Sequence, residues 1–293
     1  MPLQFEVSDK KRIRVIVDTD AACEADDPFA IAHALLSPKL IVEGITAEHF
    51  AIPGSVQQSL KEIQTVLKAM GKDIPAFPGE EGALDAGADG NSPAVDFMIS
   101  QALKEDSHPL YLLAMGAITN VAAAFRKCPE MISRVTVVWI GTHGTYYGEP
   151  AFREFNAGND VKAANEVLQS GARIWLIPSY VYSTMHIGLA EIQRRIYPYG
   201  AIGKHLFENM VAYNQTENAD WTQGESWSLG DSPAVAVTLN SGCGHYIDAP
   251  APWVNDDTSS SEMADSSVVR IYSDVDSRYV LEDFINKLQL MYA

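Results

Sequence analysis

Five carboxylate side chains lie within ten residues near the start of the chain, in the segment DTDAACEADD. They belong to Asp18, Asp20, Glu24, Asp26 and Asp27. Like charges held a few ångströms apart raise one another's pKa unless a counter-charge is present. A divalent cation such as Ca²⁺ supplies that charge and takes about six to eight oxygen ligands. A solvated helix cap is the alternative, but one aspartate pair closes a predicted strand and the other opens a predicted helix, which favours a metal site.

The same strand ending also fits a second class of enzyme. Phosphatases that form an aspartyl-phosphate begin with a strand that ends in Asp-x-Asp, with Mg²⁺ alongside. Those enzymes need Thr or Val two residues after the second aspartate, and this chain has Ala22 there. An aspartyl-phosphate phosphatase therefore remains an alternative that the sequence supports less well.

The segments around the cluster are predicted to hold it at the edge of a sheet. Arg12–Asp18 is apolar and β-branched, as is typical of a buried strand. DPFAIAHALLS follows as a helix, with Asp27 as its N-cap and Pro28 at the first helical position. The acidic segment is therefore expected to be the loop that joins a strand to a helix.

Short apolar runs alternate with amphipathic segments through most of the chain. The pattern predicts further strands at Leu40–Thr46 and in YLLAM, RVTVVWIG, RIWLIP and VVRIY, helices such as Ser55–Gly71 between them, and a mostly helical portion over 188–214. Such alternation specifies an α/β fold with a mostly parallel sheet and helices on both faces. We expect one domain over 1–293, with ligands bound at the carboxyl ends of the strands, near a topological switch point.

Composition and charge exclude several classes of function. Apolar residues make up 47% of the chain and charged residues 20%, as in ordinary globular domains. The 21 basic and 38 acidic residues leave a net charge of −17, which repels nucleic acids and anionic membrane surfaces. No apolar run has the length of a membrane span, no signal-peptide core follows Met1, and three widely spaced cysteines form no disulfide framework. We therefore expect a cytoplasmic protein that binds neither nucleic acid nor membrane.

A series of short motifs gives the chain a family resemblance. After DTD and DD come GIT at 44–46, Gly-x-x-Thr-Asn at 116–120, Glu-Phe-Asn at 154–156, and an aspartate before an AVA helix at 231. In this order the motifs resemble the inosine/uridine-preferring nucleoside hydrolase family, and the resemblance covers essentially the whole chain. It implies a Rossmann-like nucleoside hydrolase fold, one Ca²⁺ ion, a small-molecule riboside substrate and a homo-oligomer. It also implies that water cleaves the N-glycosidic bond.

The resemblance assigns metal-binding and catalytic roles to four positions. Asp20 matches the aspartate that touches the metal and takes the proton of the attacking water. Asp27 matches a bidentate calcium ligand, and Asp231 matches the last calcium ligand, which also lies against the sugar. Thr119 matches the residue whose backbone carbonyl binds calcium, although it would otherwise be read as a helix N-cap.

Further positions match groups that hold the sugar. Asp26, Glu154 and Asn156 match residues that bind ribose hydroxyls, and Asp18 matches a supporting aspartate. Taken singly, Glu154 and Asn156 would be read as polar residues of a surface loop. The resemblance is therefore what gives these side chains a role.

The acidic loop and the segment after GIT depart from the family pattern. The loop is two residues longer than usual and lacks a Pro-Gly pair, so that Cys23 or Glu24 could enter the pocket, although packing is the more ordinary role for Cys23. Ala51 stands where the family often has an asparagine. A missing sugar contact could then come from Glu48 or His49.

Two more departures concern the leaving group. Gly230 stands where many members have a histidine that protonates the departing base, and His143 lies in a loop that lacks the family's asparagine. Aromatic residues could line a pocket for the base and raise its basicity by stacking, although each is more often core filling; these are Trp221, Trp227, Tyr182 and His186. We assign no general acid, and a non-catalytic, calcium-dependent binder of sugars or nucleosides remains the main alternative to the hydrolase.

Overall fold

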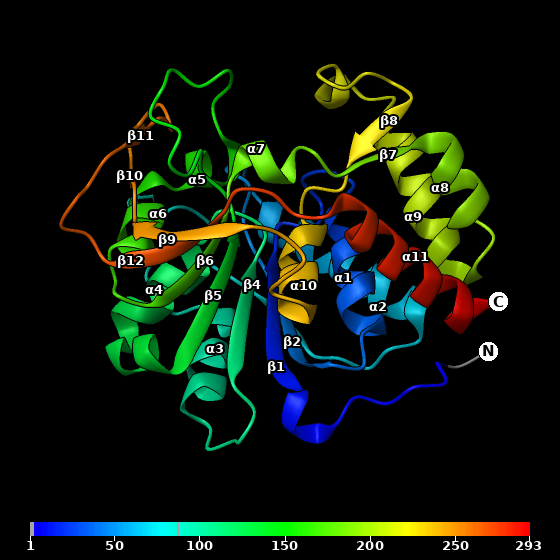
Figure 1. The fold of residues 1–293 in the computed structure, drawn as a ribbon, viewed down its shortest axis with the longest axis horizontal. Coiled ribbons are helices and arrows are strands. Elements are labelled where there is room, and N and C mark those ends of the chain that lie inside the picture. Colours follow the sequence, from blue (N-terminus) through cyan, green and yellow to red (C-terminus); the bar gives the residue numbers. More distant parts are fainter. Residues whose placement is uncertain (1–2, 87) are drawn as a thin grey trace.

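The computed structural model describes residues 3–86 and 88–293, which are built around one eight-stranded sheet (Figure 1). Its strands, in spatial order, are β3 (Ala76–Pro78), β2 (Leu40–Ala47), β1 (Ile13–Thr19), β4 (Leu110–Ala114), β5 (Val135–Ile140), β6 (Arg173–Ile177), β12 (Val268–Tyr272) and β9 (Tyr246–Pro250). Neighbouring strands are parallel except for β9, which is antiparallel to β12. The predicted mostly parallel sheet is confirmed.

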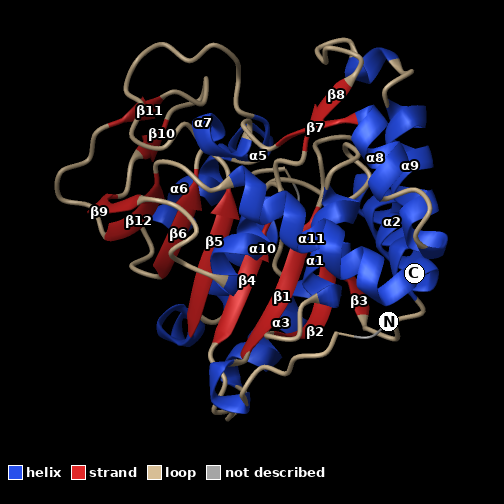
Figure 2. Cartoon of the chain, turned by 45° about the vertical axis from the view of Figure 1, so that its right-hand side comes forward, coloured by secondary structure: helices blue, strands red, loops and turns tan. Residues whose placement is uncertain are grey.

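Two hydrophobic cores lie on the two faces of this sheet because successive side chains of a strand point in opposite directions. In β1, Val15 and Val17 belong to one core and Ile16 belongs to the other, and all three are fully buried. Helices cover both faces, as the sequence predicted (Figure 2). The first core includes α1 (Asp27–Leu36), α2 (Ser55–Met70), α9 (Gly200–Tyr213), α10 (Ser232–Leu239) and α11 (Ser277–Tyr292). The second includes α3 (Pro93–Leu103), α4 (Thr119–Lys127) and α6 (Val161–Leu168).

Short elements complete the chain. Those at the carboxyl-terminal side of the sheet, at the top of Figure 1, are α5 (Phe155–Asn159), α7 (Ser179–Tyr182), β7 (His186–Gly188) and β8 (Ser226–Ser228). The others are α8 (Leu189–Arg195), β10 (Trp253–Val254), β11 (Ser260–Ser261) and the 3-10 helices η1 (Asp9–Lys11), η2 (Pro129–Arg134) and η3 (Glu217–Ala219). None of the described helices is long and apolar enough to cross a membrane.

Element boundaries differ from the predictions by one or two residues. The first strand ends at Thr19, one residue later than predicted. Helix α1 begins at Asp27 and has Asp26 as its N-cap, so the prediction of Asp27 as the N-cap was wrong by one position. Gly71 closes α2, as predicted, and is its C-cap with a left-handed φ of 62°. The mostly helical portion contains α8 and α9. The antiparallel strand β9 and the pair of β7 with β8 were not predicted.

The sheet has a topological switch point between β1 and β4. The order β3-β2-β1-β4-β5-β6 means that connections from β1 run toward one edge, and those from β4 run toward the other. Loops that leave the two strands in opposite directions open a crevice at their carboxyl ends, where ligands bind in such folds. The acidic loop follows β1, so the fold places it at this crevice.

Candidate functional site

Three acidic side chains converge at the switch point. One ligand oxygen from each of Asp26, Asp27 and Asp231 lies within 4.8 Å of the others, and all three residues are buried. Asp26 and Asp27 come from the amino-terminal end of α1, and Asp231 comes from the amino-terminal end of α10. Asp27 Oδ1 accepts a hydrogen bond from the Thr19 hydroxyl at the end of β1. The sequence had assigned Asp26 to the sugar, and the structure places it inside the acidic trio.

Burial makes these carboxyls hard to ionise. It raises the pKa of Asp26 to about 6, of Asp27 to about 7 and of Glu24 to about 8, with neighbouring carboxylates adding to the last two. Burial and the charges of neighbouring carboxylates raise the pKa of Asp20 and Asp231 well above the ordinary range. When burial and neighbouring carboxylates raise several pKa values together, the site lacks the positive charge that would stabilise the ionised carboxylates.

A hard cation fits this donor set. All the converging groups are carboxylate oxygens, which Ca²⁺ and Mg²⁺ prefer to nitrogen and sulfur ligands. Asp18 Oδ2 and Asp20 Oδ2 are buried without a hydrogen-bond partner, although buried polar atoms are normally paired. Asp20 is outside the convergent trio, but it is near enough for the charges of Asp27 and Asp26 to raise its pKa. The residues present therefore suit a metal ion.

Glu48 is a further buried carboxyl group near Asp20. It is 1% exposed, and neither of its carboxyl oxygens has a hydrogen-bond partner. Burial, followed by the charge of Asp18, raises its pKa well above the ordinary range. A Cβ atom on Gly116 would lie 2.2 Å from Glu48 Oε2 and 3.1 Å from Asp20 Cγ. The glycine of the Gly-x-x-Thr-Asn motif therefore leaves room for both carboxyl groups.

Asp18 is held by polar groups from neighbouring elements. Its Oδ1 accepts hydrogen bonds from the Thr46 hydroxyl at 2.6 Å and from Asn120 Nδ2 at 2.9 Å. Asn120 Nδ2 also donates to the carbonyl of Ala47 at 3.2 Å, which ties α4 to the end of β2. Asp18 is therefore firmly oriented beside Asp20. Asn120 belongs to a motif that the sequence singled out, but no role was predicted for it.

Thr119 and His49 share a buried hydrogen-bond chain. The Thr119 hydroxyl donates to Asp160 Oδ2 at 2.8 Å, so His49 Nε2, also at 2.8 Å, donates to Thr119. His49 Nδ1 accepts from the amide of Ala51, and burial lowers the pKa of the imidazole. Both ring nitrogens are occupied, which leaves His49 none to offer a sugar. Thr119 is the first residue of α4, with Ile118 as the N-cap.

Glu154 is buried and fully hydrogen-bonded. Its Oε2 accepts from the amides of Thr142 and Ala157, both at 2.8 Å. Its Oε1 accepts from the amide of Asn156 at 3.3 Å and from the Tyr182 hydroxyl at 2.8 Å. A carboxylate offers about four acceptor positions, and all four are used here. This geometry differs from the expected direct contact with a sugar, because no acceptor position remains for it.

Asn156 lies beside Glu154 at the start of α5. Its Nδ2 donates to the carbonyls of Ile140 at 2.9 Å and Met115 at 3.3 Å, at the ends of β5 and β4. Both amide protons are therefore committed to the backbone. The side-chain oxygen is the atom that can still meet a substrate.

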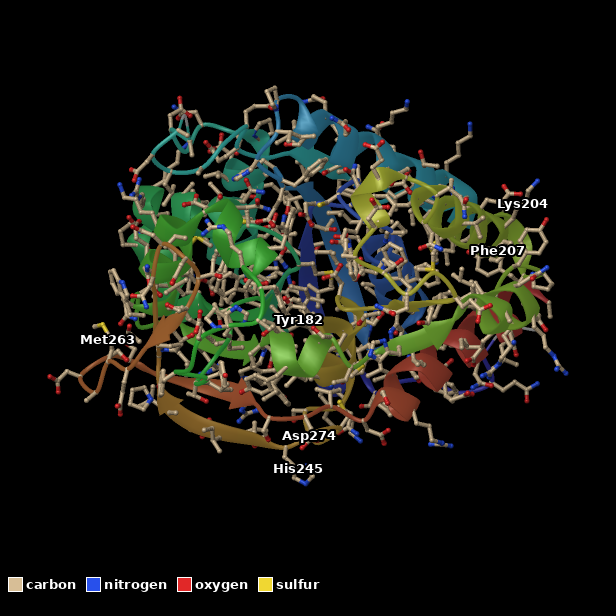
Figure 3. The ribbon with its side chains drawn as sticks, turned by 90° about the horizontal axis from the view of Figure 1, so that it is seen from above. Tyr182, Lys204, Phe207, His245, Met263 and Asp274 are labelled. Carbon is tan, nitrogen blue, oxygen red and sulfur yellow. The ribbon has the colours of Figure 1, made fainter. Side chains whose placement is uncertain are left out.

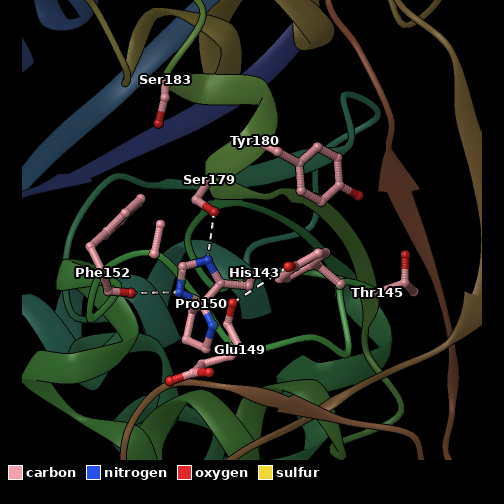
Figure 4. A pocket seen from close by; sticks show the side chains of 10 residues that line it. His143, Thr145, Glu149, Pro150, Phe152, Ser179, Tyr180 and Ser183 are labelled. Carbon is pink, nitrogen blue, oxygen red and sulfur yellow. Dashed lines mark hydrogen bonds between the residues drawn. The ribbon is translucent and has the colours of Figure 1, made fainter.

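His143 lies in the wall of a separate cavity of about 590 Å³ (Figure 4). Its Nε2 lies 3.1 Å from the carbonyl of Phe152, which can only accept, so this nitrogen donates. Its Nδ1 then accepts from the Ser179 hydroxyl at 2.7 Å. Other lining residues include Tyr146 and Tyr180. None of the three acidic residues of the trio lines this cavity, and the hydrogen bonds to Phe152 and Ser179 occupy both ring nitrogens of His143.

Aromatic side chains adjoin the acidic loop on its other side. Trp227 is 2% exposed and packs edge-on against Tyr213 and Trp221, with ring centroids 5.6 and 5.4 Å away. Burial and then the charge of Glu24 raise the pKa of Tyr213, which places this aromatic group near the loop. Burial also raises the pKa of the Cys23 thiol, so this cysteine is a poor nucleophile.

Comparison with known proteins agrees with this geometry. Residues 15–280 match the family described as inosine-uridine preferring nucleoside hydrolase. The pyrimidine-specific ribonucleoside hydrolase RihA of Salmonella arizonae is 29% identical in an alignment of 245 residues, and the match covers 75% of this chain and 75% of the relative. A plant nucleoside hydrolase, PpNRh1, superposes with a TM-score of 0.80 at 19% identity, covering 94% of this chain and 99% of the other. A purine-preferring ribonucleoside hydrolase from Gardnerella vaginalis superposes with a TM-score of 0.78 at 22% identity, covering 95% and 99%.

Members of the matched family are metal-dependent glycosidases that hydrolyse the N-glycosidic bond of nucleosides. The match spans nine-tenths of the chain, and the fold agrees over nearly its full length. The chain therefore belongs to the inosine-uridine preferring nucleoside hydrolase family and is a glycosidase.

Proposed function

We propose that this protein hydrolyses the N-glycosidic bond of a ribonucleoside or related riboside, with Ca²⁺ in the acidic site. The observation that carries the proposal is the convergence of Asp26, Asp27 and Asp231 beside Asp20, whose Oδ2 is buried and unpaired. An unpaired carboxylate oxygen next to a cation site is suited to accept a proton from water. Family membership disfavours the aspartyl-phosphate phosphatase.

In the proposed reaction, the oxygen of a water molecule attacks the anomeric carbon while Asp20 takes a proton from it. The bond from that carbon to the base nitrogen breaks, and its electron pair leaves with the base. Positive charge develops on the sugar, and the surrounding carboxylates stabilise it in a site that excludes bulk water. Asp26 and the side-chain oxygen of Asn156 hold sugar hydroxyls and so orient the anomeric carbon.

The cation is proposed to be held by Asp20, Asp27, Asp231 and the backbone carbonyl of Thr119. When bound, it supplies positive charge that keeps the carboxylates ionised, orients vicinal hydroxyls and makes water more acidic. Calcium is proposed rather than another ion because the set is rich in carboxylates and comes from separate loops. Such sites suit the larger and less geometrically demanding ion.

Activation of the leaving group is the weakest part of this site. Gly230 carries no side chain, and we assign no general acid to the base. We therefore expect a riboside with a good leaving group to react faster than an ordinary nucleoside. The lack of a general acid at Gly230 is also what supports the alternative, a non-catalytic sugar binder.

A reducing-sugar assay tests the proposal. The panel contains inosine, uridine and p-nitrophenyl riboside, since the related enzymes act on different bases and the last needs no protonation. After chelation of metals, we expect no turnover, with recovery on addition of Ca²⁺. Tight riboside binding with no turnover on any of them would establish the binder instead. Turnover of p-nitrophenyl phosphate with Mg²⁺ alone would establish the phosphatase.

A further inference from the structure

The ring of Tyr182 covers Gly230 at the edge of the acidic trio. A Cβ atom on Gly230 would lie 3.3 Å from Tyr182 Cδ2 and 3.3 Å from Asp26 Oδ2. The phenol ring and the Asp26 carboxylate thus both lie close to this glycine. Tyr182 is the last residue of α7 and is labelled near the middle of Figure 3, which views the molecule from above.

Glu154 fixes the direction of this phenol. Three backbone amides hold the carboxylate rigidly, and the Tyr182 hydroxyl donates to the remaining acceptor position. Because a phenol has one proton, its commitment to Glu154 leaves the lone pairs of the oxygen as the free function. The Tyr182 residue is partly exposed, and its hydrogen bond to Glu154 is only partly buried.

The surroundings of Tyr182 keep the phenol neutral. Burial, followed by the charge of Glu154, raises its pKa well above the ordinary range, and Glu24 and Asp231 add to the effect. The position of the ring beside Gly230 and Asp26 agrees with these contributions. A neutral oxygen with its proton engaged is a hydrogen-bond acceptor for a hydroxyl group and is a poor acid.

We propose that Tyr182 contacts the substrate, and that its phenol oxygen accepts a hydrogen bond from the primary hydroxyl of the ribosyl group. Glu154 is the positioning residue that aims it. This assignment rests on the proposed function, in which the acidic trio and its cation take the vicinal hydroxyls and leave the primary hydroxyl to be held. Although Glu154 has no free acceptor position for the sugar, it still contributes to sugar binding in this arrangement, because it orients the tyrosine that makes the contact.

The test compares two ribosides that differ only at this hydroxyl. Tyr182→Phe removes the oxygen and keeps the ring over Gly230, so the fold is expected to persist. The probes are p-nitrophenyl β-D-ribofuranoside and its 5-deoxy counterpart, with Ca²⁺ present. Tyr180→Phe is the matched control, because Tyr180 has the same side chain two residues away and lines the separate cavity.

We expect Tyr182→Phe to raise the KM of the parent riboside by roughly fivefold to tenfold, as for one neutral hydrogen bond. The KM of the 5-deoxy riboside should not change, and Tyr180→Phe should leave both values unchanged. Glu154→Asp withdraws the carboxylate by one methylene group and should reduce the same selectivity. If that variant fails to fold, Tyr182→Phe alone decides the question.

Each other outcome has a distinct meaning. An equal loss on both ribosides, or no loss on either, would overturn the contact to the hydroxyl and leave the proposed hydrolysis standing. If the wild-type protein turns over neither riboside, the proposed function fails. The same comparison is then made on dissociation constants measured by calorimetry, where loss of selectivity in Tyr182→Phe supports the contact and retained selectivity overturns it.

Discussion

Asp20 combines burial with a carboxylate oxygen that has no hydrogen-bond partner, and its pKa is raised by the charges of Asp27 and Asp26 in the acidic trio. Asp18 is oriented by Thr46 and Asn120, and Asp27 accepts from Thr19. Asp20 Oδ2 has no hydrogen bond, although the side chain is 3% exposed. A group kept unsatisfied in this way is available to a proton or a cation.

Asp20→Asn should therefore abolish turnover with little change in fold. Replacing a carboxylate by an amide removes the base, an effect of about 10²–10⁴ in kcat. The measurement is kcat on p-nitrophenyl riboside at saturating Ca²⁺, so that weaker metal binding does not mimic the loss of the base. Asp283→Asn, at a carboxylate that contacts His33 and Lys287, is the control. Wild-type kcat in Asp20→Asn would remove this residue from the proposed role.

Substitution of Gly116 is also expected to lower activity. The added methyl of Gly116→Ala would meet Glu48 Oε2 at 2.2 Å, so the Glu48 carboxyl must move against Asp18 or Asp20. We expect kcat/KM to fall by about tenfold or more, since small displacements of catalytic groups are costly. Gly188→Ala is the matched control, because its nearest neighbour would lie 4.0 Å away. Equal activity of the two variants would show that the space over Gly116 does not matter.

At the scale of elements, the sequence best predicted the helices and strands whose formation depends on the residues of one segment alone. The helix predicted over Ser55–Gly71 forms at Ser55–Met70 with Gly71 as its cap, because apolar spacing and capping are local properties. The strand β9 was missed because its pairing with β12 depends on a partner distant in sequence. The short pair of β7 with β8 was missed for the same reason.

The end of α2 provides a test at this scale. Gly71 caps the helix with φ of 62°, and its amide donates to the carbonyls of Leu67 and Lys68. Gly71→Ala should lower the free energy of unfolding by about 1 kcal/mol, because side chains with a Cβ disfavour the left-handed region. Gly71→Asn should lower it less, since asparagine tolerates that conformation. Chemical denaturation measures both, and an unchanged midpoint in Gly71→Ala would contradict the proposed role of the cap.

For the whole molecule, the acidic site links stability to pH and to metal. Unfolded carboxyls titrate at a pH of about 4. Burial, with neighbouring charges, raises the folded values to about 6, 7 and 8 at Asp26, Asp27 and Glu24. Between these limits the folded state holds more protons than the unfolded state, so stability falls as pH rises. Each such proton contributes about 1.4 kcal/mol per pH unit.

The melting temperature of the metal-free protein should therefore fall as the pH is raised from about 5 to about 8. Added Ca²⁺ should raise the melting temperature more at the upper end, because the ion replaces the protons that the carboxylates have lost. Scanning calorimetry with and without Ca²⁺ measures the effect. Asp27→Asn should shrink the response to Ca²⁺. A Ca²⁺ shift that is the same at both pH values would show that the ion binds elsewhere.

The sequence by itself determined most of the elements of the main sheet, its mostly parallel order and the position of the acidic loop after the first strand. Those features follow from periodicity and from motif order, which are properties of neighbouring residues. Only the tertiary structure decided that Glu154 has no free acceptor, that both nitrogens of His49 are occupied and that Tyr182 covers Gly230. Those outcomes depend on which hydrogen bonds and which empty space a side chain meets, and segments far apart along the chain supply both.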